Sequence, residues 1–180
     1  GDAVSLADDF KDANVGDALG CFTPEMRVLT SEGYKEIQCI RIGDLVLTKD
    51  NSYKPVWNIF PKYIEDVILN IKVSGIKNII RVTKNHIVPA YIDGVLVEVN
   101  AGDLKQNDIL IIPDGHNNYI YSEIEYIYES IYDGYVFDLG VEDIHYYTVE
   151  NVLVPDSGVF FMRIIPLVVG SHREDVNSMP

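Results

Sequence analysis

Short apolar segments, separated by turn-forming residues, cover most of the chain after Met26. They are rich in Ile, Val and Tyr, which favour an extended backbone on a half-buried sheet surface. This pattern predicts an all-β fold. The predicted strands are residues 27–30, 34–39, 45–48, 56–60, 68–73, 78–82, 87–91, 95–99, 145–149 and 152–154.

Two pairs of these strands are separated by residues that favour tight hairpin turns. Asp93 and Gly94 follow the strand at 87–91, and this dipeptide is a strong signal for a two-residue turn. Glu150 and Asn151 suggest a second hairpin between 145–149 and 152–154.

Two segments of the chain also resemble one another. Residues 40–47 (IRIGDLVL) and 104–111 (LKQNDILI) each place an acidic residue at a turn just before an apolar strand. A weak repeat of this kind predicts two similar halves within one domain.

The composition is that of one globular domain of ordinary size, with 180 residues of which 47% are hydrophobic. A net charge of −14 argues against nucleic-acid binding, because such binding depends on Lys and Arg. No targeting segment is evident in the acidic start of the chain. The longest apolar run, at 159–169, contains Arg163 and Pro166 and is too short to span a bilayer. We therefore expect no nucleic-acid or membrane partner and a cytoplasmic location.

The two cysteines, Cys21 and Cys39, lack the spacing of a metal site or of a disulfide framework, and we expect no metal or other cofactor. Cys39 is expected to pack in the core. A solitary cysteine such as Cys21 is also more often a small buried hydrophobe than a nucleophile. Its interpretation depends on the motifs that accompany it.

Four motifs follow one another along the chain: Gly20-Cys21, Thr83-x-x-His86, Asp138 leading to His145, and Pro155-Asp156-Ser157. In this order and spacing the sequence resembles the Hint superfamily, the self-processing domains of inteins and hedgehog-type proteins. The resemblance covers residues 21–156 and implies a horseshoe-like β-fold with pseudo-two-fold symmetry. The polar segment at 113–118 is too short for the homing endonuclease that larger inteins insert hereabouts, so the resemblance is to a minimal intein. Residues 1–20 and 157–180 would then be the adjoining ends of a host protein.

The resemblance implies a specific chemistry at the Gly20-Cys21 bond. A thiol on the residue after the bond can attack the preceding carbonyl through a five-membered ring and exchange the amide for a thioester. By resemblance His86 donates a proton to the leaving nitrogen, Thr83 holds and polarises the junction, and Asp138 takes the thiol proton or tunes its pKa. Without the resemblance, His86 would be a core or turn histidine and Asp138 a solvated strand residue or cap.

At the second junction the sequence departs from the family pattern. Ser157 would accept the acyl group from Cys21, and His145 would assist cleavage after residue 156, although it could equally be a simple surface or core imidazole. Inteins usually end in His-Asn, whose side-chain amide cyclises to a succinimide, but this chain has Pro155-Asp156. A carboxylate, which we expect to be ionised at neutral pH, could form only a strained anhydride, and Pro155 supplies no titratable helper.

Three functions stay open at this point. The first is single-turnover protein splicing by a monomer whose substrate is its own flanks. The second is a hedgehog-like or bacterial intein-like domain that cleaves only at Gly20-Cys21. The third is a decayed, non-catalytic Hint insert that serves as an interaction module.

Overall fold

A computed structural model describes residues 20–156, and the regular secondary structure within them is almost entirely β-strand. The strands are β1 (Arg27–Thr30), β2 (Gly33–Glu36), β3 (Leu45–Leu47), β4 (Tyr53–Val73), β5 (Ile80–Thr83), β6 (Ile87–Ile92), β7 (Val95–Asn100), β8 (Ile109–Pro113), β9 (Tyr119–Val141), β10 (Tyr146–Val149) and β11 (Val152–Pro155). Two short 3-10 helices, η2 (Ile37–Cys39) and η3 (Ala101–Asp103), follow β2 and β7. Residues 20–156 contain no helix long and apolar enough to cross a membrane.

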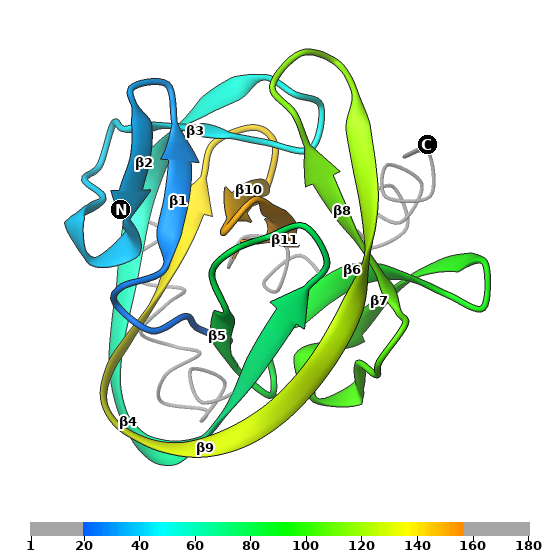
Figure 1. Cartoon of the computed structure of the whole chain (residues 1–180). Helices are drawn as coiled ribbons and strands as arrows, with labels where there is room; N and C mark the ends of the chain where they lie inside the picture. The colour runs from blue at the N-terminus through cyan, green and yellow to red at the C-terminus, as the bar shows by residue number, and fades with distance from the viewer. Residues whose placement is uncertain (1–19, 157–180) are drawn as a thin grey trace, which may run out of the picture.

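The strands form one antiparallel sheet in the order β11-β10-β1-β3-β4-β9-β8-β6-β7, with β2 beside β1 and β5 beside β4. At its centre β4 and β9 pair from Val56↔Val141 to Val73↔Ile124. Figure 1 shows these two strands curving together as a long ribbon around the molecule, with the β10–β11 hairpin enclosed by the curve. This is the all-β, horseshoe-like fold that the resemblance implied.

The predicted internal repeat is present as two copies of one hydrogen-bonded loop. In the first copy the Asp44 carboxylate accepts from the Arg41 N–H (2.8 Å), and Asp44 O accepts from the Val56 N–H (2.9 Å). In the second copy Asp108 accepts from the Lys105 N–H (2.8 Å), and its carbonyl accepts from the Ile124 N–H (2.9 Å). Each loop follows a 3-10 helix and leads through a short strand to one strand of the ribbon, which gives the pseudo-two-fold symmetry.

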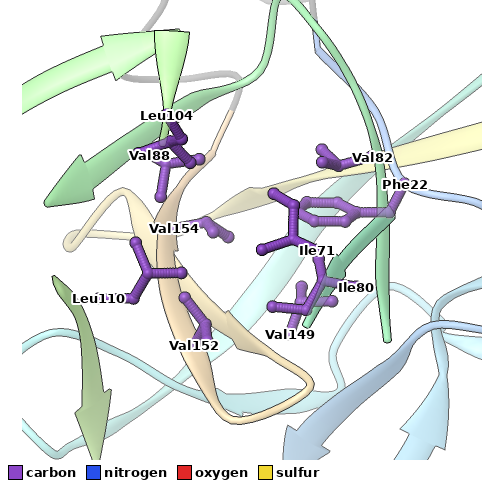
Figure 2. A pocket seen from close by; sticks show the side chains of 10 residues that line it. All are labelled: Phe22, Ile71, Ile80, Val82, Val88, Leu104, Leu110, Val149, Val152 and Val154. Carbon is purple, nitrogen blue, oxygen red and sulfur yellow. The ribbon is translucent and has the colours of Figure 1, made fainter. Parts of the chain in front are cut away.

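The main core lies where the two halves meet the β10–β11 hairpin. Figure 2 shows apolar side chains from several strands converging on one small space: Phe22, Ile71, Ile80, Val82, Val88, Leu104, Leu110, Val149, Val152 and Val154. The cavity among them has a volume of only about 10 Å³, so it holds at most one water molecule and the packing is nearly complete.

The β10–β11 hairpin is anchored by a buried carboxylate at its turn. Glu150 and Asn151 both have positive φ (44° and 70°), as a two-residue hairpin turn requires. Glu150 is 1% exposed, and it accepts hydrogen bonds from the Arg27 N–H (2.6 Å), the Arg27 guanidinium (3.1 Å) and Asn78 Nδ2 (3.0 Å). These contacts fix the hairpin whose far end leads to Asp156.

Most predicted strands are confirmed, and both predicted hairpins are present, the first with Asp93 and Gly94 at positive φ. Three expectations are wrong. The strands expected at 56–60 and 68–73 are parts of a single β4, because between its pairings with β3 and β5 this strand has only β9 beside it and can accommodate Pro61. Cys39 is exposed, not packed, and the strand expected at 34–39 ends in η2. No strand was predicted for residues 119–141, which form the long strand β9.

Candidate active site

The segment that begins at Gly20 is inserted as a short extended strand between β5 and β9. Phe22 N–H donates to Phe137 O (2.8 Å) and Phe137 N–H donates back to Phe22 O (2.7 Å). On the other side the Thr83 N–H donates to Cys21 O (2.9 Å). Phe22 itself is 1% exposed, so the apolar residue after Cys21 fixes the junction in the core.

Thr83 also holds the nitrogen of the Gly20-Cys21 bond. The Cys21 N–H donates to Thr83 Oγ1 at 2.9 Å. The Thr83 hydroxyl in turn donates to Asn85 Oδ1 (2.7 Å), which leaves an oxygen lone pair for the Cys21 N–H. Sequence reasoning missed Asn85, although it lies inside the Thr83-x-x-His86 motif that it supports.

Gly20 lies directly against the backbone of His86. A Cβ atom at position 20 would come within 2.1 Å of His86 Cα and 2.5 Å of His86 N, so only glycine fits without movement of the chain. The His86 ring is 2% exposed and packs on Phe22, with 4.6 Å between ring centroids. The loop from Thr83 is tied down because Ala101 N–H donates to His86 O (2.7 Å).

The hydrogen bonds of His86 define its tautomer. Nδ1 lies 2.8 Å from Ile87 O, and because a carbonyl can only accept, Nδ1 carries a proton. In the neutral ring Nε2 therefore presents a lone pair. Nε2 is buried without a hydrogen-bond partner among residues 20–156 and lies 3.8 Å from Asp138 Oδ1. It is placed to gain a proton and then to donate it.

Asp138 lies on β9 as a buried carboxylate, 3% exposed, and is not a solvated strand residue. Its Oδ1 accepts from the Leu139 N–H (2.8 Å) and from the Tyr147 hydroxyl (2.6 Å). Hydrogen bonds to a carboxylate offset part of the cost of burying its charge.

The thiol of Cys21 is 2% exposed, and burial raises its pKa, with the charge of Asp138 adding to the rise and that of Lys62 opposing it. Cys21 therefore carries a protonated thiol at rest. Together with Lys62 and Thr83 it lines a cavity of about 310 Å³. A thiol in this setting needs a nearby proton acceptor before it can act as a nucleophile.

Asp156 and His145 form a second cluster at the end of β11. Asp156 accepts from the Val141 N–H (2.5 Å), and its Oδ2 forms an ion pair with His145 Nδ1 at 3.5 Å. Burial raises the pKa of Asp156 above its usual value, although His145 and the Val141 N–H act in the opposite direction. The pKa of His145 is also raised, chiefly by its contact with Asp156.

The two clusters are close enough to interact electrostatically. The charge of Asp138 contributes to the raised pKa of Asp156, and both carboxylates contribute to the raised pKa of Tyr147. Pro155 pairs with Tyr146 in the hairpin, next to Asp156. Ser157 lies outside the described residues. Residues 20–156 contain no group of three His, Cys, Asp or Glu side chains that could hold a metal ion.

The horseshoe sheet with a cysteine, threonine, histidine and aspartate around its first junction defines a Hint-type domain. More specifically, the chain belongs to the family described as the pretoxin HINT domain, which it matches over residues 27–162. Gly20 and Cys21 precede the matched stretch, whereas the other candidate residues lie within it: Thr83, His86, Asp138, His145, Pro155, Asp156 and Ser157. The family and the fold support autocatalytic processing or protein splicing as the general activity.

Similar proteins agree with this assignment. The chain is 28% identical over 128 residues to Warthog protein 6 of Caenorhabditis elegans. This match covers 66% of the chain but only 21% of that protein. It is 36% identical over 82 residues to an uncharacterized protein of Methanocaldococcus jannaschii, and this match covers 43% of the chain and 10% of that protein. The chain therefore spans only a small part of these two relatives.

Solved structures share the fold. The gp41-1 intein superposes with a TM-score of 0.61 at 24% identity, covering 76% of this chain and 98% of the intein. The bacterial intein-like domain from Clostridium thermocellum superposes with a TM-score of 0.63 at 24% identity, with the same coverage of both chains. A DnaB intein from Synechocystis gives 0.64 at 16% identity, again covering 76% and 98%.

The steric fit of Gly20 predicts that Gly20→Ala displaces the junction from β5. The added methyl group cannot share space with the His86 backbone, so the hydrogen bonds between Cys21 and Thr83 lengthen or break. We expect amide exchange at Cys21 and Thr83 to accelerate at least about tenfold. The amides of the β6–β7 hairpin serve as the internal reference, and unchanged protection at both positions would contradict the steric account.

The His145–Asp156 pair predicts a pH-dependent stability. Because the folded pKa of His145 is raised, its contribution is complete below about pH 6.5 and is lost as the pH rises through the folded pKa. We expect the free energy of unfolding to fall by about 1 kcal/mol between about pH 6 and about pH 8.5. In Asp156→Ser the pair is absent and this part of the slope should vanish in denaturant titrations. Equal slopes in the two proteins would show that the pair does not titrate in this range.

Proposed function

We propose that this domain splices itself out of its host chain, beginning with an N–S acyl shift at Cys21. The observation that carries the proposal is the enclosure of the Gly20-Cys21 bond. Its nitrogen donates a hydrogen bond to Thr83 Oγ1, and its glycine lies against the His86 backbone. The charge of Asp138 acts on the adjoining Cys21 thiol. Residues 21–156 then form the processing domain, and residues 1–20 and 157–180 are the flanks on which it acts.

In the first step Cys21 Sγ forms a bond to the Gly20 carbonyl carbon, and the bond from that carbon to the Cys21 nitrogen breaks. The thiol proton must leave as sulfur attacks, and the expelled nitrogen must gain a proton to depart as an amine. Asp138 and His86 Nε2, which lie 3.8 Å apart in the same buried site, are the two groups able to relay that proton. Thr83 Oγ1 stays hydrogen-bonded to the Cys21 nitrogen throughout this step and keeps that nitrogen aligned.

In the next step the Ser157 hydroxyl attacks the thioester, and the acyl group moves from sulfur to oxygen with release of the Cys21 thiol. The Asp156 carboxylate then attacks its own backbone carbonyl carbon to form a cyclic anhydride, and the bond from that carbon to the Ser157 nitrogen breaks. This nitrogen gains a proton from His145 and leaves as an amine, which frees the branched product. A final oxygen-to-nitrogen acyl shift joins Gly20 to Ser157 by a peptide bond. Water reopens the anhydride on the excised domain.

The last cleavage limits the rate. A half-life of about an hour corresponds to a barrier of about 22 kcal/mol, and one missing catalytic contact worth about 3 kcal/mol slows a reaction more than a hundredfold. Asp156 is engaged by the Val141 N–H and by His145, which favour its ionised form and hold it in place. Pro155 supplies no proton at this junction.

Cleavage at Gly20-Cys21 alone is the second candidate. The cavity of about 310 Å³ beside Cys21 favours it, because such a space admits water or another small nucleophile to a thioester at that position. Slow chemistry at Asp156 would lengthen the life of the thioester and increase the share of this route.

The thioester is tested by adding a strong external nucleophile. Hydroxylamine should release residues 1–20 as a hydroxamate and leave a domain that begins at Cys21, as measured by intact mass. Cys21→Ala should abolish release, and His86→Ala should slow it by about a hundredfold or more. Cys39→Ala, which removes the exposed thiol, is the matched control and should release at the parent rate.

Retention of intact mass in folded parent protein would reject both catalytic candidates. That result would leave the domain as a non-catalytic interaction module.

The limiting role of the second junction predicts that Pro155→His combined with Asp156→Asn raises ligation of the flanks. An amide nitrogen forms a stable imide, whereas a carboxylate oxygen forms an anhydride that reverses or hydrolyses. The joined Gly20-Ser157 product and the free domain should both increase in mass spectra of the double variant, by at least about tenfold. Faster ligation by the parent than by the variant would show that Asp156 is a competent end group.

A further inference from the structure

Tyr147 on β10 is a fully buried tyrosine whose hydroxyl reaches the first cluster. It is 0% exposed, its hydroxyl donates to Asp138 Oδ1 at 2.6 Å, and its ring packs edge-on against Phe22 at 6.2 Å between centroids. Through Phe22 the same aromatic contact extends to His86. Tyr147 therefore contacts the acidic residue of the site and the residue that follows the nucleophile.

The neighbouring tyrosine shows that burial alone does not require this arrangement. Tyr146 is also 0% exposed, but it faces the other side of the hairpin, where its hydroxyl lies 3.3 Å from Glu98 and its ring packs near Ile111 and Leu153. The two residues are alike in type, strand and burial. They differ in the side of the strand that they face: the Tyr147 hydroxyl donates to Asp138, whereas the Tyr146 hydroxyl donates to Glu98.

The phenol of Tyr147 acts here as a hydrogen-bond donor to Asp138. Burying a hydroxyl is unfavourable unless it is hydrogen-bonded, and a phenylalanine would fill the same space without that cost. Burial, followed by the charge of Asp138, raises the pKa of Tyr147 well above its usual value, so the hydroxyl remains protonated and donates at any working pH.

The charges around Asp138 explain why a permanent donor is useful. Asp138 contacts His86 Nε2 and the Tyr147 hydroxyl, and its charge acts on the Cys21 thiol and on the Asp156 carboxylate. Lys62 on β4 acts on Cys21 in the opposite direction. Burial raises the pKa of Asp156, and the charge of Asp138 adds to the rise, so the two carboxylates repel one another. The phenol and the Leu139 N–H both favour the carboxylate.

We propose that Tyr147 is a positioning residue for the acyl shift, which orients Asp138 and maintains it as a carboxylate able to accept the Cys21 thiol proton. This inference rests on the proposed function. During the shift the thiol proton leaves Cys21 Sγ as the bond from sulfur to the Gly20 carbonyl carbon forms. Asp138 accepts this proton while it still accepts the hydrogen bond from the Tyr147 hydroxyl. The proton then passes on to the expelled Cys21 nitrogen.

The pH profile of hydroxylamine-induced release separates this role from simple packing. Tyr147→Phe keeps the ring but removes the donor, so Asp138 ionises less readily and the acidic limb of the profile moves to higher pH. We expect the ratio of variant to parent rate to be lowest, about one-tenth, at the acidic end of the profile and to approach one as the pH rises. The titration of hydroxylamine itself cancels in this ratio. Tyr146→Phe is the matched control and should follow the parent profile.

Each other outcome has a definite meaning. A ratio that is unchanged, or lowered equally at every pH, would overturn the positioning role while leaving the thioester chemistry intact. No release by the parent at any pH would reject the proposed function instead. If Tyr147→Phe does not fold, 3,5-difluorotyrosine placed at position 147 alone supplies a stronger donor and should shift the acidic limb to lower pH. A shift to higher pH, or none, would contradict the proposal.

Discussion

The antiparallel pairing of β4 with β9 is the constraint on which the rest of the structure depends. It joins the two halves of the pseudo-two-fold repeat and continues from Val56↔Val141 to Val73↔Ile124. Because β5 pairs with β4 while Phe22 bridges β5 and β9, the register of this ribbon decides which side chains meet at the junction. A shift of one residue would turn Asp138 to the opposite face and empty the site of its carboxylate.

The site combines deeply buried side chains with several ionisable groups. Cys21, His86, Asp138 and Asp156 are each at most 3% exposed, and hydrogen bonds or ion pairs to the carboxylates limit the cost of their burial. The same burial keeps the thiol protonated at rest. Such a site is compatible with autocatalytic processing, because the Gly20-Cys21 bond is itself part of the enclosed site and no entry path for a second large molecule is needed.

The sequence was sufficient to name the candidate residues of the first junction but not the residues that contact and support them. Gly20, Cys21, Thr83, His86 and Asp138 could be named because they occur as ordered motifs, and the structure brings them together. Asn85 and Tyr147 could not be assigned, since a polar residue in a turn and one of two adjacent tyrosines carry no signal of their partners. The exposure of Cys39 was likewise missed, because local apolar composition does not specify which side of a short 3-10 helix faces solvent.

The sequence by itself determined the short-range features of this protein. The Asp93-Gly94 and Glu150-Asn151 turns follow from local backbone preferences, and the repeated acidic loops follow from a pattern visible in the chain. Only the tertiary structure decided the full length of β9, the burial of Asp138 and its contact with Tyr147. The physical reason is that strand pairing and hydrogen bonds between distant residues depend on register, which no local window of sequence contains.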